Sequence, residues 1–168
     1  MTELDQVWSQ MLDEAAKRSA DLGRMDVVEY LRLKATNDAI RRAGANWLFD
    51  IVLEIAGRAV RDHHGVTMER EEPHNFAVGS SNMAGAVVRI RQGVRCLTVE
   101  AGWARLPSHG VMRKGALAHA RISHFGMPRH TAELRLMHGE GLPVWLDEAD
   151  TAIDAAAIER HFAILLAT

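Results

Sequence analysis

The spacing of hydrophobic positions predicts two helical segments at the start of the chain. Residues 3–22 place apolar side chains at helical intervals, and Thr2 with Asp5 resembles a capping box at their start. A second helical pattern covers residues 26–64 and carries a continuous apolar stripe on its later half. The tripeptide Gly44-Ala45-Asn46 can interrupt a helix, so this pattern is compatible with one kinked helix or with two.

After Gly65 the hydrophobic pattern changes from helical spacing to alternation. Val66–Arg70 is compatible with a short strand, and Glu71–Met83 is predicted to be a loop. A hairpin is predicted next, with strands Ala86–Arg91 and Val94–Trp103 around the turn Gln92-Gly93. This turn would place Arg89 opposite Cys96 and Val88 opposite Leu97.

The remaining elements are three strands and a closing helix. Pro143 cannot donate a backbone hydrogen bond, so the last strand is expected at an edge of the sheet. Thr151 and Asp154 form another capping box with aspartate in the usual glutamate position. The predicted strands are Gly115–His124, Thr131–His138 and Leu142–Asp147, followed by a helix to the end of the chain.

This order of elements predicts an α+β fold. Helices come first, strands follow as one run, and a helix closes the chain, which differs from the alternation of α/β proteins. We expect N-terminal helices packed on one face of a curved antiparallel meander of five or six strands, with a C-terminal helix. The length favours a single domain over residues 1–168, and the sheet face away from the helices is expected to be wholly or partly open.

Strand alternation assigns side chains to two faces of this sheet. One face, the core face, collects Val88, Ile90, Leu97, Val99, Ala101, Trp103, Ala118, Ala120, Ile122, Leu134 and Leu136. The other, which we call the arginine face, collects Arg89, Arg91, Cys96, Thr98, Glu100, Leu117, His119, Arg121, Ser123, Glu133, Arg135 and Met137. His119 and His124 are therefore expected on opposite faces.

Charge is strongly segregated along the chain, although the net charge is only −2. Residues 1–72 carry −4, residues 73–138 carry +7, and residues 139–168 carry −5. The middle segment therefore has either an anionic partner or internal partners in the acidic ends.

Composition narrows the class of protein. Hydrophobic residues make up 48% of the 168 residues, as is usual for a folded globular protein. No apolar run approaches the roughly 20 residues of a membrane span, and the acidic start Thr-Glu-Leu-Asp-Gln is not that of a targeting peptide. A single cysteine, Cys96, excludes an internal disulfide and favours a cytoplasmic protein.

Common catalytic and cofactor motifs are missing, so no cofactor is expected. There is no G-x-S-x-G, P-loop or G-x-G-x-x-G sequence. His138-Gly-Glu140 matches the start of a zinc deaminase motif, but the downstream P-C-x-x-C is absent, and no metal site is expected. Nucleic acid is disfavoured because the arginine face lacks aromatic side chains and the pI is about 6.5.

One loop is a local candidate for anion binding. The segment Arg105–Gly115 combines Arg105, His109, Arg113 and Lys114 with glycines that let backbone N–H groups approach a ligand.

The leading hypothesis is a binding or interaction module. An anionic small molecule or an acidic protein surface would bind the arginine face through paired donors of planar guanidinium groups, and a histidine would modulate binding near neutral pH. The predicted ligand-binding residues are Arg89, Arg91, Arg121, Arg135 and His119.

Two alternatives belong to other classes of protein, and whether the chain is an enzyme is left open. In the first, a small enzyme uses His119 with Glu133 or Glu100 as acid and base in a cone-like cavity. In the second, the segregated charges assemble a structural homodimer.

Overall fold

The protein has the predicted α+β fold, with three α-helices and a six-stranded antiparallel sheet among the described residues. The computed structural model describes the backbone of residues 3–167 and the side chains of residues 6–167. The chain divides into two compact units, Met1–Arg42 and Ala43–Thr168. That residues 1–168 form a single domain stays a prediction.

The first unit is a helical hairpin formed by α1 (Glu3–Asp21) and the first part of α2 (Met25–Asp62). Gly23 connects the helices with a φ of +70°, a backbone conformation that glycine adopts without strain. Trp8 Nε1 donates a hydrogen bond to Asp38 Oδ2 at 3.1 Å and links the two helices. The predicted first helix is confirmed, whereas the capping box at Thr2 lies outside the described residues.

α2 is one continuous helix, which decides between the two alternatives for residues 26–64. Gly44 does not interrupt it. A Cβ atom at Gly44 would lie 2.5 Å from Leu136 Cδ2, so glycine is needed there for the close approach of the helix to β5. Further along α2, Leu48, Val52 and Ala56 are fully buried.

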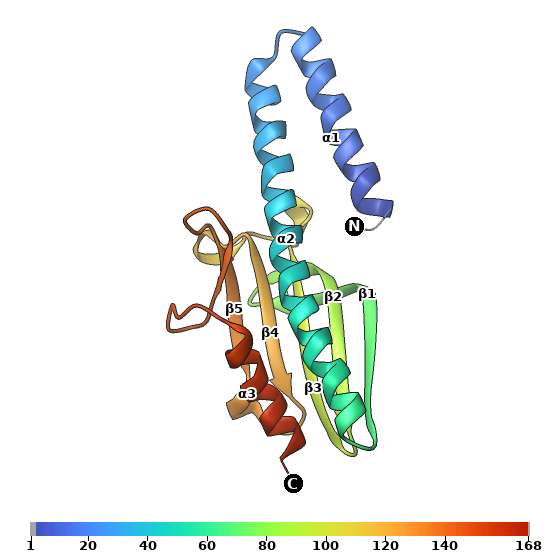
Figure 1. Cartoon of the computed structure of the whole chain (residues 1–168). Helices are drawn as coiled ribbons and strands as arrows, with labels where there is room; N and C mark the ends of the chain where they lie inside the picture. Colours follow the sequence, from blue (N-terminus) through green and yellow to red (C-terminus); the bar gives the residue numbers. More distant parts are fainter. Residues whose placement is uncertain (1–2, 168) are drawn as a thin grey trace. The chain divides into compact units, whose positions relative to one another are not determined.

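The second unit is a meander covered by helices on one face. Its strands pair antiparallel in chain order, so each strand lies beside its sequence neighbours. The part of α2 after residue 42 and α3 (Ala155–Leu166) lie over the same face of the sheet (Figure 1). The six strands are β1 (Val66–Val78), β2 (Ser81–Gln92), β3 (Arg95–Trp103), β4 (Ala118–His124), β5 (Ala132–Met137) and β6 (Val144–Leu146).

The two edge strands, β1 and β6, test the predictions that were based on Pro73 and Pro143. β1 continues through Pro73 to Val78, so the loop predicted for Glu71–Met83 is wrong. Proline is tolerated because β1 is an edge strand and the ladder shifts register between Glu71 and His74. The edge position of β6, expected from Pro143, is confirmed.

The β2–β3 hairpin exists, but its predicted register is wrong. Gln92 pairs with Arg95, which makes Gly93-Val94 the turn, and Gly93 has a φ of +58°. Arg89 therefore lies opposite Thr98, and Cys96 lies opposite Arg91. The error is two residues, which equals the side-chain period of a strand, so every face assignment is unchanged.

The start of the closing helix also differs from the prediction. Asp154, not Thr151, is the N-cap of α3, and its Oδ1 accepts a hydrogen bond from Ala157 N at 2.8 Å. The helix buries Ile158, Phe162 and Leu165 in the core of the second unit.

The sheet curls strongly at a pair of glycines. Gly85 and Gly102 face each other on β2 and β3, and a Cβ on either residue would meet backbone atoms of the opposite strand. The curl brings β1 over the arginine face. A hydrogen bond of 2.9 Å from Arg121 on β4 to the carbonyl oxygen of Ala77 on β1 shows this. The arginine face is therefore only partly open, and its Val87 side chain is fully buried.

Candidate functional site

The two arginines on β2 are paired with carboxylates of β1. Arg89 lies 2.9 Å from Glu71 and 3.6 Å from Glu69, and Arg91 lies 3.6 Å from Glu69. The hydrogen bond from Arg89 lowers the pKa of Glu71, and the same bond raises the pKa of Arg89. Sequence reasoning missed Glu71 because it predicted a loop there, and it did not predict that the strand containing Glu69 pairs with β2.

The arginines on β4 and β5 also have partners. Arg121 lies 3.0 Å from Glu100 and 3.4 Å from Glu133. Glu100 additionally lies 2.9 Å from Nε2 of His74, which extends the network to β1. Arg135 forms an ion pair with Asp150. All four arginines predicted to bind a ligand are thus compensated by carboxylates within the chain.

His119, the fifth predicted ligand-binding residue, is buried and has a lowered pKa. Its side chain is only 5% exposed, and it lies between Gly102 and Arg135 on the neighbouring strands. Burial is the largest cause of the lowered pKa, and the positive charges of Arg135 and Arg113 add to it. The charge of Glu133 and a backbone hydrogen bond with Leu134 oppose the shift. His119 is therefore neutral at physiological pH.

The acid and base pair of the enzyme hypothesis is not aligned in the sheet. Glu133 lies opposite Arg121, whereas His119 lies opposite Arg135. Glu100 is one of the two carboxylates that contact Arg121. Both carboxylates are therefore engaged by Arg121, although the charge of Glu133 still acts on His119.

The segment 104–115 packs over the turn between β1 and β2. Ser81 Oγ donates a hydrogen bond to the carbonyl oxygen of Val111 at 3.0 Å. Met112 packs against the cluster of Phe76, Val78 and Met83. The Arg113 guanidinium occupies the space that a Cβ at Gly79 would need. These contacts hold the segment 104–115 against β1, β2 and the turn between them.

Three buried nitrogen atoms of the segment 104–115 and of β4 lack a hydrogen-bond partner among the described residues. Among the described residues, Arg105 Nε, His109 Nδ1 and His119 Nε2 are buried without a hydrogen bond. Arg105 places its guanidinium carbon 4.9 Å from the ring centre of Trp103. Arg113, on the same segment, is close enough to His119 to affect its pKa. Buried polar atoms in folded proteins nearly always bond to protein, water or a ligand, so these three nitrogens are candidate contacts for water or a polar ligand.

His124, unlike His119, lies on the core face, as the alternation predicted. His124 Nε2 is 3.0 Å from Nδ1 of His161 on α3, and the two rings stack with centres 5.3 Å apart. His130 approaches His124 edge-on at 6.0 Å between ring centres. Sequence patterns carry no signal for this pairing, because the residues lie on β4, α3 and the turn Pro128–His130.

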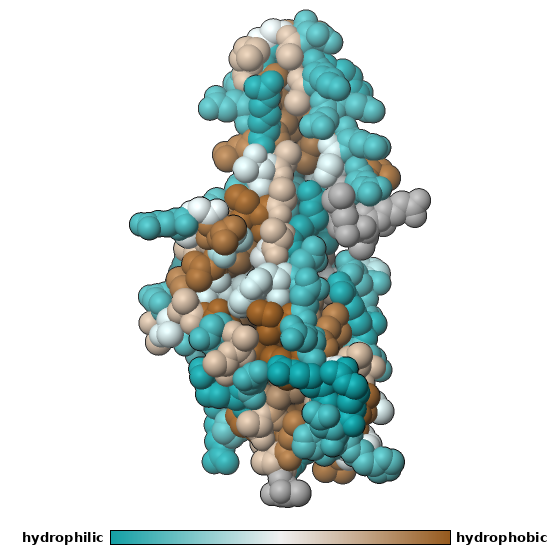
Figure 2. Space-filling view, viewed as in Figure 1, coloured by the Kyte–Doolittle hydropathy of each residue, from teal (hydrophilic) through white to brown (hydrophobic). Residues whose placement is uncertain are grey.

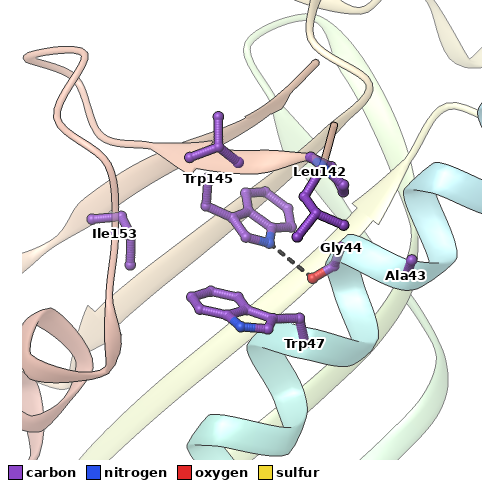
Figure 3. Close-up of a pocket in the computed structure, with 8 residues that line it drawn as sticks. Ala43, Gly44, Trp47, Leu142, Trp145 and Ile153 are labelled. Atoms are coloured by element: carbon purple, nitrogen blue, oxygen red, sulfur yellow. Dashed lines mark hydrogen bonds between the residues drawn. The ribbon is translucent and has the colours of Figure 1, made fainter. Parts of the chain in front are cut away.

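An apolar hollow of about 330 Å³ lies on the helix side of the second unit. Trp145 Nε1 donates a hydrogen bond to the carbonyl oxygen of Gly44 at 2.9 Å, and the Trp47 ring lies nearby (Figure 3). Hydrophobic side chains gather on the surface beside α2 in this view (Figure 2). The lining residues are all uncharged: Ala43, Gly44, Trp47, Leu142, Pro143, Val144, Trp145 and Ile153. This hollow suits a neutral apolar group rather than an anion.

No protein-family model, curated protein or solved structure matches the chain. Within the described part of the chain, no three His, Cys, Asp or Glu side chains are grouped so that they could hold a metal ion. None of the helices in residues 3–167 combines the length and hydrophobicity needed to cross a membrane.

Proposed function

We propose that the protein is a binding module for a small anion, held between the segment 104–115 and His119. The observation that carries this proposal is the His119 side chain, which is 5% exposed and has no hydrogen-bond partner at Nε2. Arg105 Nε and His109 Nδ1, both in the segment 104–115, are also buried without a hydrogen-bond partner. A ligand with several oxygen atoms would satisfy these nitrogens.

The charge of the segment favours an anion over a neutral ligand. Arg105, Arg113 and Lys114 are cations, and no acidic residue occurs between residues 101 and 132. The guanidinium of Arg105 can present paired donors to a carboxylate or phosphate group. Gly115 has a φ of +68°, a backbone conformation in which an N–H group can turn towards a ligand.

The neutral state of His119 adds a dependence on pH. The Nε2 atom of neutral His119 can accept a hydrogen bond from a protonated ligand. Alternatively, the imidazole takes up a proton when an anion binds. Because a nearby anion favours the charged imidazole, affinity should rise as pH falls towards the ordinary histidine pKa of about 6.5.

The proposed site differs from the four arginines that sequence reasoning favoured. An anion or an acidic protein surface at Arg89, Arg91, Arg121 and Arg135 stays a prediction, and it would have to displace carboxylates already in place. The enzyme hypothesis with His119 also stays a prediction. The loop site has better support because its nitrogens have no competing partner in the described residues.

Thermal denaturation with added anions tests the proposal. Inorganic phosphate and malonate should raise the Tm of the full chain relative to chloride at equal ionic strength, because they bind the folded state. Arg105→Gln and His119→Gln should each remove most of this shift. The matched control is Arg91→Gln, which removes an exposed, paired arginine and should retain it. The proposal is wrong if the unmodified protein shows no shift in Tm. It is also wrong if Arg91→Gln loses the shift while Arg105→Gln and His119→Gln keep it.

The predicted homodimer and cytoplasmic location are further proposals. Assembly through segregated charges has limited support, because the arginines of the middle segment already pair with Glu69, Glu71 and Asp150 of the acidic ends.

A further inference from the structure

The apolar hollow of the second unit has three walls that hydrogen bonds hold together. One wall comes from α2, one from residues 142–145 at the start of β6, and one from Ile153 before α3. Trp145 bonds to both other walls. Its Nε1 donates to the carbonyl oxygen of Gly44 at 2.9 Å, and its carbonyl oxygen accepts a hydrogen bond from the Ile153 N–H at 2.9 Å. The walls are therefore formed before a ligand arrives, as in most small-molecule sites.

The lining offers a ligand apolar surface and no charge. None of the residues that line the hollow is ionisable. The Trp145 indole N–H and the Gly44 carbonyl group bond to each other. A charged ligand would lose its water without gaining an oppositely charged partner from the lining, so it would bind poorly. The rings of Trp47 and Trp145 instead favour aromatic ligands, because offset or edge-on ring contacts stabilise beyond the area that they bury.

The volume of the hollow sets the size of the ligand. It measures about 330 Å³. An apolar cavity of about 150 Å³ holds one benzene molecule, so this hollow has room for roughly two rings. A protein partner is disfavoured, because the large apolar side chains that the lining exposes are Trp47 and Leu142. At 41% and 79% exposed, they offer roughly 250 Å², well below the roughly 800 Å² per partner of a standard protein interface.

We propose that this hollow is a binding site for a neutral aromatic molecule of about two rings. The ligand would lie against the rings of Trp47 and Trp145. Leu142 and Ile153 lie on either side of those rings in this view (Figure 3). The hollow shares no residue with the proposed anion site, so each of the two proposals can fail without the other.

Nuclear magnetic resonance of the full chain tests the proposal, with neutral 2-naphthol as the probe. The chain has four tryptophans, whose indole N–H signals report on each ring separately. Added 2-naphthol should shift the signals of Trp47 and Trp145 to saturation with a Kd below about 1 mM. The signals of Trp8 and Trp103 should stay unchanged. Naphthalene-2-sulfonate, which has the same rings and a negative charge, should need at least about tenfold higher concentration for the same shifts.

Two variants test whether the probe binds in the hollow. Leu142→Asp puts a carboxylate at a lining position that is 79% exposed, and it should weaken 2-naphthol binding at least about tenfold. Ala43→Phe fills the hollow from an exposed position on α2 and should weaken binding without adding a charge. The matched control is Val94→Asp, because Val94 is 90% exposed and does not line the hollow. It should bind 2-naphthol as the unmodified protein does.

The proposal is overturned if 2-naphthol leaves the signals of Trp47 and Trp145 in place, because the hollow would then be filled or closed by another part of the protein. It is also overturned if both lining variants keep the affinity of the unmodified protein, or if Val94→Asp loses affinity to the same extent. An unchanged Trp103 signal shows in each variant that the second unit is folded. Equal affinity for naphthalene-2-sulfonate would refute the neutral class of ligand.

Discussion

The stacked pair of His124 and His161 should make the stability of the second unit depend on pH. Burial, followed by the charges of His161 and His130, lowers the pKa of His124 to about 4. Burial, Arg160 and His130 also lower the pKa of His161. Because both shifts are downwards, the folded protein holds these rings neutral at pH values where the unfolded chain protonates them.

The magnitude follows from the two pKa values of His124. The unfolded residue titrates at about 6.5 and the folded residue at about 4. Its contribution to stability is therefore intact above about pH 6.5 and is lost progressively as pH falls from about 6.5 through about 4. At about pH 5 the unfolded state gains up to about 2 kcal/mol, since each pH unit between the two values is worth about 1.4 kcal/mol.

Urea unfolding at about pH 7.5 and about pH 5 measures this effect. The free energy of unfolding should fall with pH in the unmodified protein, and His124→Gln should reduce that fall by up to about 2 kcal/mol. His138→Gln is the matched control for the loss of one imidazole, because His138 is exposed. If His124→Gln and the control lose equal stability between the two pH values, burial of a neutral His124 does not account for the pH dependence.

Three substitutions test the packing of the second unit. Gly85→Ala should destabilise the fold by more than about 3 kcal/mol, because its Cβ would meet the carbonyl oxygen of Ala101; an unchanged Tm would refute the tight curl. Glu100→Gln should lower the free energy of unfolding by about 1–3 kcal/mol, because Arg121 loses its closest charged partner, and denaturant titration measures this. Asp154→Ala should lower it by about 1 kcal/mol through loss of the N-cap, whereas Asp154→Asn should retain most of the stability.

Local sequence patterns determined the fold class and the faces of the sheet. Alternation placed His119 and His124 on opposite faces, and the structure confirms this. The assignment survived the wrong register at Arg89, because a shift of two residues returns each side chain to the same face. Hydrophobic periodicity is a property of neighbouring residues, so it can be read without knowing which strands meet.

Only the tertiary structure decided which charges remain available. The +7 segment suggested an anion at the arginine face, but Arg89 and Arg135 pair with Glu71 and Asp150, which lie 18 and 15 residues away in the chain. The pairing of β1 with β2 brings Glu71 to Arg89, and the chain after β6 brings Asp150 to Arg135. Neither contact is encoded in local spacing. The same long-range packing buried His119 without a partner at Nε2, which moved the proposed anion site from the open strands to the segment 104–115.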